Sequence, residues 1–145
     1  MKIANTYYFL LSFVVTSAII LNLTPLFYKW QVVSIAADTI EVRRSNKTLK
    51  VRLCGVEVPP TFQKTSREYL QNILEKKSVK LSFVDNSSVE VFLGKDEKLI
   101  NKSMLMDGMA KYNSDLCPSQ SILRTAQEIA KWQKIGVWSS ESQGL

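Results

Sequence analysis

Histidine is absent from this chain of 145 residues, and cysteine occurs only at Cys54 and Cys117. The lack of histidine removes the usual proton carrier at neutral pH and the commonest metal ligand in proteins. Any hydrolytic chemistry must therefore use carboxylates. One cysteine falls on a predicted core strand and the other in a loop before the last predicted helix, and isolated cysteines are often simply small buried apolar residues.

Charged side chains are missing from residues 7–28, which are predominantly apolar. Roughly 20 such residues suffice for a helix to cross the hydrocarbon core of a bilayer. Residues 1–28 are therefore predicted to form a transmembrane anchor in contact with membrane lipid. A secretory signal peptide is the alternative, because Lys2 provides a positive start, although no clean cleavage site follows.

The net charge of the whole chain is +6, and the part after residue 28 carries +5 because residues 1–28 contain one lysine and no acid. A basic excess of this size is consistent with polyanionic partners, either nucleic-acid phosphates or anionic lipid headgroups. Lys29, Arg43 and Arg44 follow the apolar stretch, so the positive-inside rule alone favours an internal C-terminal domain.

Alternating apolar residues and turn signals after the anchor predict five short strands and three helices. A helix with Thr61 as its N-cap is expected between the third and fourth strands, and the last helix is expected to begin at Ser119 or Ser121 and close at Gly136. This order predicts an α+β, mainly β, fold: a five-stranded OB-fold barrel, with a half-open α+β sandwich as the alternative. The predicted elements are strands at Trp30–Ile35, Thr39–Val42, Leu49–Leu53, Val79–Phe83 and Val89–Leu93, and helices at Thr61–Lys76, Leu99–Met106 and from Ser119 or Ser121 onward.

The last predicted helix has an apolar side, and two tryptophans surround it. Trp132 and Trp138 are expected to pack this helix onto the barrel. The residues expected along its packed side are Ile122, Ala126, Ile129, Ala130 and Gln133.

Two short segments resemble the active-site strand and loop of the thermonuclease (staphylococcal nuclease-like) family. They are Asp38-Thr39 and the run from Arg52 to Pro60, which reads Arg-Leu-Cys-Gly-Val-Glu-Val-Pro-Pro. The family pattern is Asp-Gly-Asp-Thr followed by Arg-Leu-x-Gly-Ile-Asp-x-Pro-Glu. The resemblance covers residues 29–138 and favours the barrel over the sandwich, leaving residues 139–145 as a flexible tail. Its later landmarks are Ile100-Asn101, Asp107-Gly108-Met109-Ala110 and Gly136-Val137-Trp138.

The resemblance implies a calcium-dependent phosphodiesterase site, but several of its parts are replaced. Asp38 and Glu57 fall on the two metal aspartates, so Ca²⁺ is a possible cofactor, with Glu57 one methylene longer than its counterpart. Arg52 is the phosphate-binding arginine. Pro60 stands where the family has its glutamate base, which leaves Glu57 as the candidate catalytic carboxylate. Ser88 stands where the second arginine is expected, and no Arg or Lys occurs between residues 81 and 94.

Exported relatives in this family commonly carry cysteine at both positions, which implies a disulfide between Cys54 and Cys117 in an oxidising compartment. This implication opposes the positive-inside count and favours a single-pass membrane protein with its soluble domain on the exported side.

A basic run lies on the second predicted hairpin, at Arg43, Arg44, Lys47 and Lys50. OB barrels often bind single-stranded nucleic acid with basic residues and stacked aromatics, so these four residues are candidate nucleic-acid contacts. Trp30 and Tyr112 could act as stacking platforms, although a core position is the favoured interpretation for both.

Taken together, these patterns predict a membrane-anchored thermonuclease-like domain that is catalytically weak or inactive. Such a domain would be a binding module or subunit for nucleic acid or for a membrane protein complex. The alternative is a functioning calcium-dependent nuclease that uses Asp38, Arg52 and Glu57 on DNA or RNA.

Overall fold

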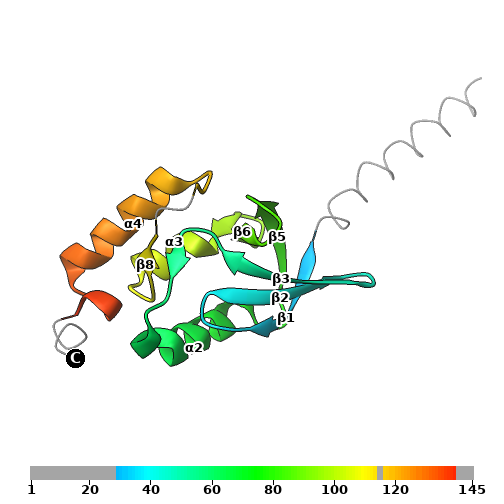
Figure 1. Ribbon diagram of the computed structural model, residues 1–145, viewed down its shortest axis with the longest axis horizontal. Helices are drawn as coiled ribbons and strands as arrows, with labels where there is room; N and C mark the ends of the chain where they lie inside the picture. Colours follow the sequence, from blue (N-terminus) through cyan, green and yellow to red (C-terminus); the bar gives the residue numbers. More distant parts are fainter. Residues whose placement is uncertain (1–28, 114–115, 140–145) are drawn as a thin grey trace, which may run out of the picture.

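The computed structural model describes residues 29–113 and 116–139 (Figure 1). The predicted anchor at residues 1–28 and nearly all of the predicted tail lie outside this part of the chain. Within residues 29–113 and 116–139, none of the helices combines the length and the apolar character needed to cross a bilayer.

A closed barrel of five strands forms the centre of the described chain. Neighbouring strands follow the order β3-β2-β1-β5-β6, and β6 then pairs with β3 in parallel, which completes the ring. This closed order is consistent with the predicted OB-fold and not with a half-open sandwich. The strands are β1 (Trp30–Ile35), β2 (Thr39–Arg44), β3 (Lys47–Leu53), β5 (Ser78–Phe83) and β6 (Ser88–Leu93).

Three α-helices pack around this barrel within the described residues: α2 (Gln63–Leu74), α3 (Ile100–Met106) and α4 (Gln120–Gln133). Figure 1 shows α4 at the opposite end of the molecule from the tip of the β2–β3 hairpin. Short elements complete the chain and were not expected. They are β4 (Val56–Glu57), β7 (Lys98–Leu99), β8 (Lys111–Tyr112) and the 3-10 turns η2 (Pro60–Phe62) and η3 (Gly136–Trp138).

Helix α2 begins two residues later than predicted and without the expected cap. Pro59 and Pro60 direct the chain into the 3-10 turn η2, and Thr61 lies inside this turn. The residue before α2 is Phe62, whose side chain cannot cap a helix. The prediction of a Thr61 cap was therefore wrong, because the proline pair sets the local geometry first.

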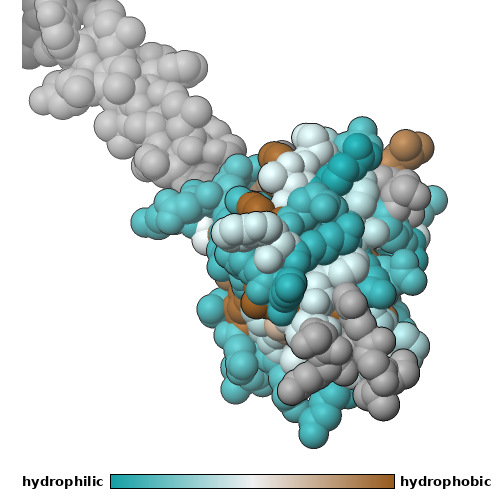
Figure 2. Space-filling model, turned by 90° about the vertical axis from the view of Figure 1, so that its left-hand side faces the viewer, coloured by the Kyte–Doolittle hydropathy of each residue, from teal (hydrophilic) through white to brown (hydrophobic). Residues whose placement is uncertain are grey.

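The face that helix α4 presents to the core includes the predicted Ala126 and Ala130 but otherwise differs from the prediction. Its buried residues are Leu123, Ala126, Gln127 and Ala130. Ile122 and Ile129 are exposed, and Trp132 is 84% exposed, so the predicted packing role of Trp132 was wrong. Figure 2 views this end of the molecule and shows a mainly hydrophilic surface with separate apolar spots.

The end of α4 also differs from the prediction, because Lys134 and not Gly136 takes the left-handed capping conformation, at φ 54°. Gly136 instead packs against Gly108: the Val137 amide donates to the Gly108 carbonyl at 2.8 Å. A Cβ on Gly136 would lie 1.9 Å from that carbonyl oxygen, so no other residue fits at this approach.

Asn101 links the first turn of α3 to both strands that close the barrel. Its carboxamide oxygen accepts from the Val91 amide at 2.9 Å. Its NH₂ group donates to the carbonyls of Cys54 at 2.9 Å and Val89 at 3.0 Å. The side chain is fully buried, so water cannot replace these bonds. One amide therefore satisfies three backbone groups where β3 ends beside β6.

We expect Asn101→Ala to lower the free energy of unfolding by roughly 2–4 kcal/mol, because it leaves buried backbone groups without partners. Urea unfolding followed by tryptophan fluorescence measures the change. Ser103→Ala is the matched control in the same helix, since the Ser103 hydroxyl bonds the Leu99 carbonyl at 3.4 Å and the Tyr69 side chain and, within the described residues, makes no bond to a strand of the barrel. Equal losses in the two variants would contradict the special role of Asn101.

Candidate functional site

The residues that resemble a phosphodiesterase site gather where β3 meets β6. Arg52 pairs with Thr39 across β2–β3 and with Ser88 across the parallel β3–β6 contact. The Asp38 carbonyl accepts from the Leu53 amide at 2.8 Å. Asp38, Arg52 and Ser88 therefore lie at the same end of neighbouring strands, as the sequence pattern implied. This arrangement follows from strand register and does not depend on any single side-chain contact.

Asp38 and Glu57 are the two predicted calcium ligands. The Asp38 carboxylate accepts from the Thr39 hydroxyl at 3.0 Å. Glu57 is exposed on β4, directly opposite Lys111 of β8. Within the described residues, no three Asp, Glu, His or Cys side chains gather closely enough to hold a metal ion. Ca²⁺ takes six to eight oxygens, so backbone carbonyls and water would have to complete any calcium site built on Asp38 and Glu57.

Pro60, which begins η2, is exposed. It stands at the position of the family glutamate and has no titratable group. Glu57 is the nearest carboxylate in the sequence, and it pairs in register with Lys111 across β4–β8. The ammonium of Lys111 lies over the Trp138 ring, 5.4 Å from its centre.

The position assigned to the second arginine is neutral and buried. Ser88 is 4% exposed, and its hydroxyl makes no hydrogen bond within the described part of the chain. A guanidinium at this register position would lie beside Arg52, because the two residues pair directly. The present site therefore has one arginine where the family has two.

Asp85 adds a negative charge to the same end of the barrel, and the sequence interpretation assigned it no role. Its carboxylate accepts from the Ser87 amide at 2.7 Å, the Ser87 hydroxyl at 3.0 Å and the Ser88 amide at 2.8 Å. The Ser87 amide and hydroxyl hold the pKa of Asp85 below its ordinary value, and the charge of Arg52 adds to this effect. An Asp followed by Asn-Ser-Ser is a recognisable Asx-turn signal.

The basic run on the β2–β3 hairpin divides between two faces. Ile40, Val42, Val51 and Leu53 point into the barrel, so the residues that alternate with them point outward. Arg43 and Lys50 therefore share the outer face with Arg52. Glu41 lies on this face too, directly opposite Lys50. Arg44 and Lys47 pair with each other on the opposite face, so the four predicted contacts do not form one patch.

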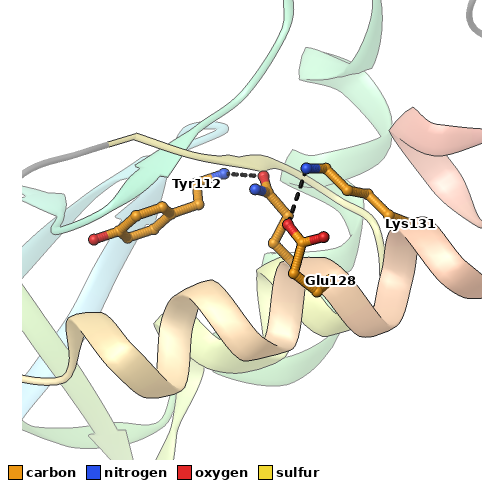
Figure 3. Close-up of polar contacts among 4 residues, drawn as sticks. Tyr112, Glu128 and Lys131 are labelled. Atoms are coloured by element: carbon orange, nitrogen blue, oxygen red, sulfur yellow. Dashed lines mark hydrogen bonds and ion pairs between the residues drawn. The ribbon is translucent and has the colours of Figure 1, made fainter.

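Both aromatic candidates for stacking make contacts within the folded domain. Trp30 is 5% exposed, and the Arg44 guanidinium lies 4.7 Å from the centre of its ring. Tyr112 is half-buried on β8, and its amide donates to the Gln127 side chain at 2.7 Å (Figure 3). The favoured core interpretation of Trp30 is confirmed. Trp138 packs as predicted, with Lys111 and Lys131 over its ring.

Cys54 and Cys117 form a disulfide, with their α-carbons 5.9 Å apart, so the bond implied by the family resemblance is confirmed. Gly55 lies against it at φ +70°, and an added Cβ would lie 3.0 Å from the Cys117 sulfur. Glu90 of β6 is buried near this bond and accepts from the Ser119 amide at 2.7 Å and hydroxyl at 3.1 Å. Sequence reasoning missed Glu90, because a glutamate within a strand has no distinctive signal.

The comparison with known families agrees with the nuclease resemblance seen in the sequence motifs and in the barrel. Residues 38–140 match the family described as staphylococcal nuclease homologue. The chain belongs to this family. A protein of Escherichia coli O157:H7, described as an uncharacterized endonuclease, is 28% identical over 70% of this chain and 71% of its own length. A protein of Escherichia coli with the same description matches to the same extent.

We expect the Cys54→Ala/Cys117→Ala variant to lose roughly 2–4 kcal/mol of stability, because the bond closes a long loop in the unfolded chain. The two cysteines are 63 residues apart. Chemical unfolding with and without a reducing agent measures the effect: the reductant should destabilise the wild type and leave the variant unchanged. Mass analysis of thiol labelling in the unfolded, unreduced chain provides the check, since two labelled thiols would contradict the disulfide.

Proposed function

We propose that this chain is a membrane-anchored member of its family that binds nucleic acid and cleaves it weakly or not at all. The observation that carries this proposal is the composition of the site where β3 meets β6. Arg52 remains there at an exposed position, whereas Pro60 and Ser88 replace the groups that would activate water and hold the transition state. Binding needs only the first of these parts.

The missing base limits the rate of any hydrolysis. A positioned general base contributes about 10²–10⁴ to the rate, and proline cannot supply one. Glu57, which pairs in register with Lys111, would have to act as metal ligand and base at once. The loss of the base therefore supports weak or absent cleavage.

The single arginine limits catalysis in a second way. A fixed guanidinium on a developing phosphoryl charge can contribute about 10³ or more. Arg52 remains, but the same end of the barrel carries Asp85, whose pKa is lowered mainly by bonds from Ser87 and to a smaller extent by the charge of Arg52. The carboxylate of Asp85 therefore offsets part of the positive charge that Arg52 would present to a phosphate.

The outer face of β2–β3 supports binding to a phosphate backbone. Arg43, Lys50 and Arg52 are exposed on this face, with Glu41 as its one acid among the β2–β3 residues. The side chains stand on paired strands, so the charges keep a fixed spacing. Ionic contacts with phosphates of this kind depend on charge and need no reading of base edges.

We expect Pro60→Glu to raise calcium-dependent cleavage of single-stranded DNA by roughly tenfold or more, because it returns a carboxylate to the base position. The assay uses the full chain in detergent with end-labelled oligonucleotides. Thr61→Glu is the matched control, since Thr61 is the next exposed residue of the same turn.

Rapid cleavage by the wild type, abolished by Arg52→Ala, would overturn the proposal of weak catalysis and favour the calcium-dependent nuclease. That alternative draws on the retained Asp38, Arg52 and Glu57 and on the description of the relatives as endonucleases.

We expect Arg43→Gln/Lys50→Gln to weaken binding of single-stranded oligonucleotides and to reduce the slope of log K against log salt by roughly 1.4, the value for two lost phosphate contacts. Fluorescence anisotropy at several salt concentrations measures both quantities. Arg44→Gln/Lys47→Gln removes the same charge from the other face of the same strands and should leave the slope unchanged.

Equal losses in the two double variants would show that only net charge matters. Absence of salt-dependent binding by the wild type would instead contradict a nucleic-acid partner. In that case a membrane protein complex, detected as a native assembly in detergent, becomes the favoured partner.

A further inference from the structure

A groove of about 710 Å³ opens at the end of the barrel where β1 begins. Trp30 of β1, Arg44 and Lys47 of the β2–β3 hairpin, and Lys80 and Phe83 of β5 contribute to its lining. Figure 1 shows the first residues of β1 and the tip of this hairpin on the same side, away from α4. The groove lies on the face opposite to the one proposed for nucleic acid, because Arg44 and Lys47 alternate with the outward-facing residues.

The groove combines cations with an exposed aromatic ring. Phe83 is 46% exposed and contacts Trp30 edge to face, with ring centres 6.4 Å apart. Trp30 is buried beneath the Arg44 guanidinium, so its ring has no free face on which a nucleobase could stack. The groove therefore offers positive charge and one partly exposed aromatic ring, that of Phe83, while the larger ring of Trp30 is covered.

Positive charge extends beyond the groove at this end of the molecule. A neighbouring hollow of about 410 Å³ shares Lys80 and adds Lys29 and Lys95 to the lining. Two acids belong to the same region: Glu97 pairs with Lys80 at 2.6 Å, and Asp85, which also accepts from the Ser88 amide beside the candidate site, lines the groove. The cations outnumber these acids, so the end as a whole attracts anions.

The chain itself places this end next to the proposed membrane anchor. The charge-free stretch ends at residue 28, and β1 begins at Trp30, so Lys29 is the only residue between them. One residue spans about 3.8 Å. If residues 7–28 lie in a bilayer, the groove opens within roughly the thickness of the headgroup layer. This step rests on the proposed function, because it uses the membrane attachment.

We propose that this groove is a docking site for the anionic phospholipid headgroups of the membrane that holds the anchor. Arg44 and Lys47 contact lipid phosphates, and the exposed edge of Phe83 enters the interface, where aromatic side chains are favoured. Basic residues near an anionic membrane surface each add to the attraction. Headgroup contact would fix the barrel against the membrane and leave the outer face of β2–β3 directed to solvent.

Photo-cross-linking of the full chain in nanodiscs tests the proposal, with benzoylphenylalanine in place of Phe83. We expect cross-links to lipid in nanodiscs that contain phosphatidylglycerol and few in nanodiscs of phosphatidylcholine alone. Arg44→Glu/Lys47→Glu should reduce the yield by roughly fivefold or more, because two attractive charges become repulsive. Arg43→Glu/Lys50→Glu, with the same charge change on the opposite face, should leave the yield unchanged. The photoreactive residue in place of Trp132, at the far end of the molecule, should give no lipid cross-link.

The possible results distinguish failure of the docking site from failure of the proposed function on which it rests. Failure of the chain to co-purify with nanodiscs would overturn both the anchor and this site. Co-purification without anionic-lipid cross-links at residue 83 would overturn the site alone. Loss of the cross-link in excess inorganic phosphate would show a free-phosphate site. Displacement by an oligonucleotide that binds through Arg44 and Lys47 would show a nucleic-acid groove. Either of the last two outcomes would also overturn the lipid assignment.

Discussion

The pairing of β3 with β6 is the contact on which the rest of this structure depends. It turns a row of antiparallel strands into a closed ring, and it brings Arg52 beside Ser88. Parallel strands this short provide few backbone bonds of their own, and the pair ends within two residues. The buried carboxamide of Asn101 reinforces the pair, because it bonds to two backbone groups of β6 and to the carbonyl of Cys54, the residue that follows β3. The barrel core and the candidate site are therefore stabilised by the same closure.

The site shows how a scaffold and its chemistry can change independently. Strand register alone positions Asp38, Arg52 and Ser88, so the arrangement persists whatever side chains occupy it. Pro60 and Ser88 stand where the family resemblance implies a glutamate and an arginine, and the ring is closed around them. The exposed charges on the two faces of the β2–β3 hairpin are then the main groups that the domain has for binding a partner. Strand alternation divides them, so one hairpin can present different surfaces to two polyanions.

The sequence predicted the five strands, because alternation of buried and exposed side chains is a local signal, and the family resemblance favoured their closure into a barrel. It also led to the disulfide through the family resemblance. It did not predict which side of α4 is buried, since Ile122 and Ile129 are as apolar as Leu123 and only tertiary packing distinguishes them. Glu90 and Asp85 were missed for a related reason: their roles depend on Ser119 and Arg52, which are distant in the sequence. The opposite faces of Arg43 and Arg44 follow from the period of a strand once its extent is known, but β2 is two residues longer than predicted.

The burial of Cys54 has a consequence for how the mature domain is assembled. This sulfur has no exposed surface once the barrel and α4 are joined, and its partner Cys117 is almost as inaccessible. An oxidant can reach the pair only while the segment that carries Cys117 stands away from the barrel. Oxidation therefore has to occur before this segment packs or while it is open. A chain that reached its compartment fully folded and reduced would have to open this end before it could be cross-linked.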